Sequence, residues 1–140
     1  MEPLRAAPLP RRLAALSYEA VLLVSVLFAT GVVYLLLEAA VGHGHVRLLF
    51  QACLFAVAGV YFCWHWIRGQ TLPMKTWRIR VVMRDGTPVD LLHAALRYVV
   101  AVLGLMAGGI TFLWALADTD GQFLHDRIAG TRLISTTPPR

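Results

Sequence analysis

An apolar run of helix length with charges in its first turns, residues 11–41, constrains this chain most. About 20 apolar residues suffice to cross a bilayer, so the run predicts a transmembrane helix. If the hydrocarbon begins near Leu13, Glu19 lies roughly 9 Å deep at about 1.5 Å per residue. An ionised carboxylate at that depth is costly, so we expect Glu19 to be paired, protonated or turned toward protein.

Arg12 stands seven residues before Glu19, about two helical turns, and therefore on the same face of this helix. Two interpretations of the pair are open. Arg12 can anchor the helix end while Glu19 makes a polar contact between helices. Alternatively, the two side chains meet directly or through water and handle an ion or a proton.

Composition indicates one membrane-embedded domain. Of 140 residues, 58% are hydrophobic and 15% are charged, whereas a soluble domain carries about a quarter charged residues. We place the domain at residues 13–135, between a flexible tail at 1–12, rich in proline and arginine, and a second tail at 136–140. The net charge is +5, and the basic residues lie beside apolar segments. This placement favours anionic lipid headgroups over nucleic acid as the partner.

Two further apolar segments follow. Residues 46–67 predict a second crossing, which ends in an aromatic cluster typical of the headgroup level. Between these crossings, His43 and His45 in a glycine turn are too weak a pattern to predict a metal site. Residues 90–117 form the third segment, loosened by three glycines, and either cross once or bend back. The fold class is therefore an all-α membrane protein with three apolar segments.

The polar loops repeat a pattern. Residues 69–82 and 121–134 are alike, and apolar residues alternate with other residues over 78–84, which predicts a strand. We expect residues 78–84 and 131–135 to be extended and to pair as a short strand-like loop pair at the cytoplasmic surface. Five basic residues between Arg68 and Arg84 place this loop, and with it the N-terminus, in the cytoplasm.

Four charged residues are candidates for one polar cluster, because an arginine on an apolar helical stripe seldom lacks an anionic partner. They are Arg12, Glu19, Arg97 and Asp126. The alternative is that both arginines reach lipid phosphates while Asp126 caps a turn.

Two histidines are candidates for a proton relay. His65 stands between two tryptophans and His125 precedes Asp126. A structural interpretation is also open for His65, as an interfacial side chain bonded to water or backbone.

These motifs resemble those of the RDD family of small bacterial membrane proteins. Arg12 fits the arginine at the start of the first helix, and Glu19 stands where that family has an aspartate. His125-Asp126-Arg127-Ile128-Ala129-Gly130-Thr131 resembles the C-terminal signature, and residues 69–82 resemble the central loop. The resemblance implies a multi-pass protein of the bacterial inner membrane that is connected with transport.

Two functions are consistent with these features. One is an oligomeric carrier that moves a proton or an unidentified cation through Arg12, Glu19 and Asp126. The other is an accessory or assembly protein in which the same charges form a structural latch. We expect no enzyme activity and no cofactor, because the sequence offers no nucleophile with a base, no phosphate loop and no metal cluster.

Overall fold

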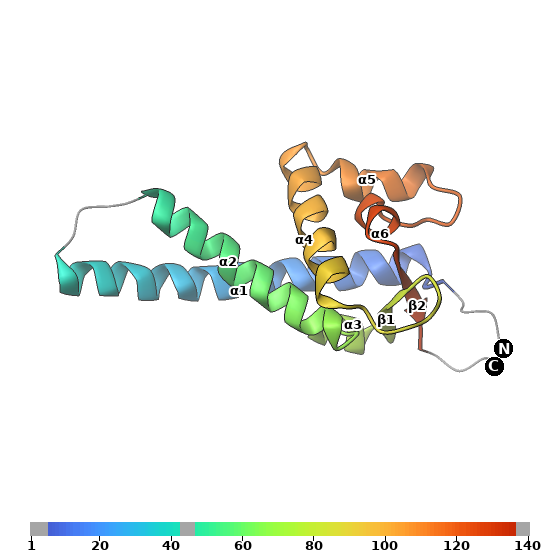
Figure 1. The fold of residues 1–140 in the computed structure, drawn as a ribbon, viewed down its shortest axis with the longest axis horizontal. Helices are drawn as coiled ribbons and strands as arrows, with labels where there is room; N and C mark the ends of the chain where they lie inside the picture. The colour runs from blue at the N-terminus through green and yellow to red at the C-terminus, as the bar shows by residue number, and fades with distance from the viewer. Residues whose placement is uncertain (1–5, 43–46, 137–140) are drawn as a thin grey trace.

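The computed structural model describes residues 6–42 and 47–136, so His43 and His45 lie outside the described residues. It confirms a mostly helical chain with one small sheet (Figure 1). The elements are α1 (Leu9–Val41), α2 (Arg47–Ile67), α3 (Leu72–Thr76), β1 (Ile79–Met83), α4 (Leu91–Met106), α5 (Ile110–Ala117), α6 (Leu124–Ile128) and β2 (Thr131–Ser135).

Two helical stretches are long and apolar enough to cross a membrane: α1, and α2 together with the α3 turn that follows it. The 33 residues of α1 extend roughly 50 Å at about 1.5 Å per residue, which exceeds a hydrocarbon core of about 30 Å. Apolar side chains such as Val24 and Phe28 are largely exposed on α1. Outward apolar side chains of this kind suit contact with lipid, so the two predicted transmembrane helices are present.

The N-terminal tail is shorter than predicted. α1 begins at Leu9 and has a proline in its first turn. Proline is tolerated there because the N–H groups of the first turn have no partner within the helix. The Ala7 N–H donates to the Leu133 carbonyl at 3.0 Å, and Ala6 forms an isolated bridge with Ile134. Residues 6–12 therefore belong to the folded unit.

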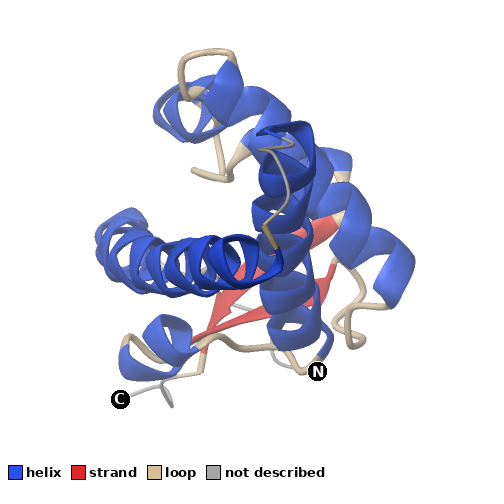
Figure 2. Cartoon of the chain, turned by 90° about the vertical axis from the view of Figure 1, so that its left-hand side faces the viewer, coloured by secondary structure: helices blue, strands red, loops and turns tan. Residues whose placement is uncertain are grey.

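β1 and β2 pair antiparallel, with Ile79 opposite Ser135 and Met83 opposite Thr131. Figure 2 shows the two strands lying among the helices. Ile79, Val81 and Leu133 are buried in the core. The prediction that these two segments are extended and paired is confirmed, although β1 begins one residue later than expected.

The third apolar segment is bent. α4 and α5 meet at 94°, so they form either one broken span or a re-entrant loop. An added Cβ at Gly104 would lie 2.0 Å from Thr111 Cγ2, so the two helices approach this closely only because residue 104 is glycine. The chain before α4 and the chain after α5 meet again, because they pair as β1 and β2 (Figure 1).

Candidate functional site

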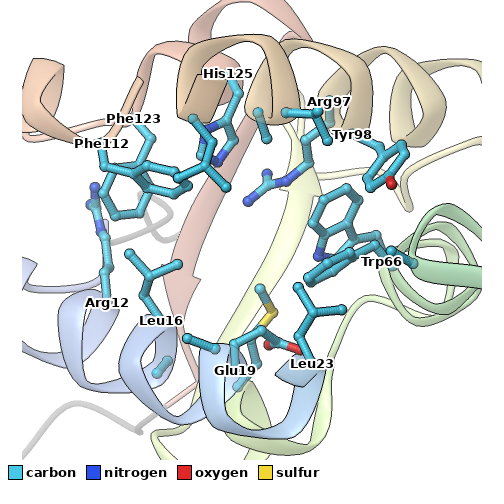
Figure 3. A pocket seen from close by; sticks show the side chains of 18 of the residues that line it. Arg12, Leu16, Glu19, Leu23, Trp66, Arg97, Tyr98, Phe112, Phe123 and His125 are labelled. Atoms are coloured by element: carbon cyan, nitrogen blue, oxygen red, sulfur yellow. The ribbon is translucent and has the colours of Figure 1, made fainter. Parts of the chain in front are cut away.

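A cavity of about 680 Å³ lies among α1, α2, α4, the start of α5, α6 and the two strands. Most of its lining is apolar, with Arg12, Glu19, Arg97 and His125 among the exceptions. Figure 3 shows the Arg97 side chain directed into this space from α4, with Arg12 and Glu19 on α1. Three members of the predicted cluster and one predicted relay histidine therefore share one cavity.

Arg97 and Asp126 form a buried ion pair between α4 and α6. Arg97 Nη1 contacts Asp126 Oδ1, and the two side chains are 2% and 0% exposed. Arg97 Nη1 also donates to Thr131 Oγ1 at 2.9 Å. The guanidinium lies 4.7 Å from the centre of the Trp66 ring. Asp126 is thus the carboxylate partner of Arg97, and the pair fixes α6 and β2 against α4.

Glu19 is buried on α1 and accepts two hydrogen bonds from hydroxyls. Thr71 Oγ1 donates to Glu19 Oε2 at 2.6 Å, and Tyr61 Oη donates to Oε1 at 3.0 Å. Among residues 6–42 and 47–136, no cationic side chain lies within ion-pair distance of Glu19. Glu19 and Arg97 interact only through the electrostatic field across the cavity.

Arg12 shares a face of α1 with Glu19 but has a different partner. Arg12 Nη1 donates to the Gly121 carbonyl, in the turn that connects α5 to α6. Asp118 organises this turn by accepting from the Gln122 N–H at 2.8 Å and from Arg127 Nε at 2.5 Å. The direct contact between Arg12 and Glu19 is therefore absent, and Arg12 connects α1 to the C-terminal half of the chain instead.

The two candidate relay histidines do not share the cavity. His65 is not a lining residue, and its ring Nδ1 lies 2.7 Å from the Tyr61 carbonyl oxygen. A different group of Tyr61, its phenol hydroxyl, donates to Glu19. His65 and Glu19 also interact electrostatically.

His125 is 4% exposed, and its ring stacks on Phe123 with centroids 5.3 Å apart. Its Nε2 lies 3.8 Å from Asp126 Oδ1. Burial lowers the pKa of His125 to about 4, although the nearby Asp126 opposes the shift. The imidazole is therefore neutral near pH 7 and does not add a third cation to Arg12 and Arg97 in the cavity.

Sequence reasoning missed the hydroxyl partners of the carboxylates. Thr71 is fully buried and also caps α3 by accepting from the Met74 N–H at 3.3 Å. Thr131 is equally buried at the first position of β2. Thr71 and Thr131 both lie in segments that resemble family motifs, residues 69–82 and the C-terminal signature, whereas Tyr61 lies in ordinary helix sequence.

Two apolar helices of spanning length, a bent apolar pair and a buried charge cluster define a small helical integral membrane protein. The RDD family model matches residues 6–130, and the chain belongs to this family. Searches of curated proteins and of solved structures found no match.

Proposed function

We propose that this protein is a small proton- or cation-linked transporter in which Glu19 carries the exchanged proton or cation. The observation behind this proposal is a buried carboxylate that lines a cavity and has hydroxyl partners in place of a cation. Ionisable side chains within membrane segments are expensive, and they commonly mark ion or proton pathways. Asp126 is less suited to this role because Arg97 already neutralises it.

The ligand atoms around Glu19 suit both kinds of cargo. The carboxylate can take up a proton while Thr71 and Tyr61 keep its oxygens hydrogen bonded. Carboxylate and hydroxyl oxygens are also the hard ligands that cations such as Mg²⁺ and Ca²⁺ prefer. The groups around Glu19 therefore fit either a proton or a cation as the cargo.

An oligomer in the bacterial inner membrane completes the proposal. Two spans and one bent pair are few helices to enclose a path across the bilayer. We therefore propose that several copies of the chain surround that path. Leu103 and Leu116 are exposed on α4 and α5 and offer apolar faces for packing between copies. The basic residues of the loop that contains β1 favour a cytoplasmic position for this loop and for the N-terminus.

A structural latch is the second candidate function, and the Arg97–Asp126 pair favours it. This pair joins α4 to α6, and the contact of Arg12 with Gly121 joins α1 to the same region. Both contacts connect distant parts of the chain without presenting a free acid to the cavity. These structural contacts would be sufficient for an accessory protein that transports no ion.

We expect Glu19→Gln to abolish flux in liposomes that contain purified protein, because the amide cannot release a proton. Flux is measured with a pH-sensitive dye under an imposed cation or proton gradient. Glu38→Gln is the matched control, since it makes the same change on α1 at a residue that does not line the cavity. Control flux should equal that of the wild type.

Two results would contradict the proposal, one concerning the carrier function and the other the role of Glu19. A wild-type protein that is folded and conducts no tested ion supports the latch and contradicts the carrier. Wild-type flux that survives in a folded Glu19→Gln variant shows that another group carries the cargo.

A further inference from the structure

We propose that the cavity binds an anionic phospholipid. Its charged group lies at the polar end with Arg12 and Arg97, and an acyl chain follows the apolar wall toward Leu27. The lipid would share the cavity that Glu19 lines, but its binding does not depend on the proposed transport.

Three buried hydrogen-bond donors that line the cavity lack acceptors within the described residues. Arg12 Nε, Arg97 Nε and Trp66 Nε1 have no hydrogen-bond partner within the described part of the chain. The three side chains line the cavity and are 3%, 2% and 5% exposed. Arginine and the indole N–H only donate hydrogen bonds, and buried donors are normally satisfied. The missing partner is therefore an acceptor.

The positive charge of Arg12 also lacks a close carboxylate partner within the described residues. Arg12 is buried, yet over residues 6–42 and 47–136 no carboxylate lies within ion-pair distance of it. Asp126, Asp118 and Asp120 act on Arg12 only at longer range. A buried cation is stable when an anion pairs with it and accepts its hydrogen bonds. An anionic acceptor meets both requirements of this site at once.

The cavity is also elongated, and its wall beyond the arginines is mostly apolar. It follows α1 from Arg12 to Leu27, which is about 22 Å at roughly 1.5 Å per residue. Leu23, Leu54 and Leu105 line the deeper part. Its volume of about 680 Å³ is in the range of small-molecule sites. Inorganic phosphate would leave this apolar surface empty, whereas an acyl chain would cover it.

Native mass spectrometry of the detergent-solubilised full chain tests the proposal. We expect phosphatidylglycerol to bind more tightly than phosphatidylcholine with the same acyl chains. Because one charge-assisted hydrogen bond supplies a factor of about ten or more, Arg12→Gln should lower the phosphatidylglycerol affinity at least about tenfold. Arg12→Lys should retain the preference. Arg68→Gln is the control, because Arg68 is exposed on Trp64 and does not line the cavity.

Leu27→Trp provides an independent arm that keeps every charge. The larger ring fills the apolar part of the cavity, so it should also weaken phosphatidylglycerol binding by about tenfold, with the melting temperature showing that the variant is folded. Equal affinity for the two lipids, or undiminished binding by folded Arg12→Gln or Leu27→Trp, would overturn the proposal. Displacement of the lipid by equimolar inorganic phosphate would show an anion site and not a lipid site.

Discussion

Asp126→Asn is expected to lower the free energy of unfolding by about 3–5 kcal/mol, the usual loss when one partner of a buried ion pair is removed. The substitution keeps the shape of the side chain but leaves Arg97, which is 2% exposed, without its counter-charge. Thr131 would remain as a neutral acceptor for Arg97 Nη1. The loss can be measured by denaturant unfolding in detergent, followed by circular dichroism.

Asp120→Asn is the matched control. Asp120 Oδ2 also lies near an arginine, 3.3 Å from Arg127 Nη2, but its side chain is 59% exposed. Exposed pairs contribute about 0–1 kcal/mol, so this variant should unfold close to the wild type. Similar losses in the two variants would contradict a dominant role for the buried pair.

A second large effect is expected from the titration of His125. Its pKa is about 4 in the folded protein and about 6.5 when it is exposed in the unfolded chain. Between these values the unfolded chain binds more protons, so the folded state loses stability as the pH falls from 6.5 toward 4. Below pH 4, the titration of His125 lowers the free energy of unfolding by roughly 3 kcal/mol, and above pH 7 it has no effect.

His125→Gln isolates this contribution, because the amide stays neutral throughout. Between pH 7 and pH 4.5, the variant should lose about 2–3 kcal/mol less unfolding free energy than the wild type. Other carboxyl groups titrate in both proteins, so only the difference between the two curves reports His125. If the unfolding free energies of the two proteins changed equally with pH, His125 would have an ordinary pKa in the folded protein and the prediction would be wrong.

Much of the fold could be predicted from the sequence, because lipid exposure imposes strong patterns. The apolar length of α1 and α2 and the alternation in β1 identified those elements. The start of α1 was misplaced because prolines were interpreted as a tail, although Pro10 lies in the first helical turn. The bend between α4 and α5 could not be settled, because it depends on the packing of Gly104 against Thr111.

The site was less predictable, because its contacts depend on turns that bring distant residues together. Arg97 signalled a partner by its place on an apolar stripe, and the structure provides Asp126. Spacing alone put Arg12 beside Glu19, but the turn at Gly121 draws Arg12 away. Tyr61 carried no pattern, and Thr71 lay in the loop that resembles the family motif without any sign that its hydroxyl would meet Glu19.

Glu19, Arg97 and Asp126 form one electrostatic cluster, in which Arg97 pairs with Asp126 and lies in the field of Glu19. A double-mutant cycle in unfolding free energy, with Glu19→Gln and Asp126→Asn singly and together, tests it directly. With Asp126 neutralised, Glu19 is the remaining acid whose field stabilises Arg97, so Glu19→Gln should cost more in that background than in the wild type. We predict a coupling of about 0.5–3 kcal/mol. Losses that add within about 0.3–0.5 kcal/mol would contradict the account and leave two independent sites.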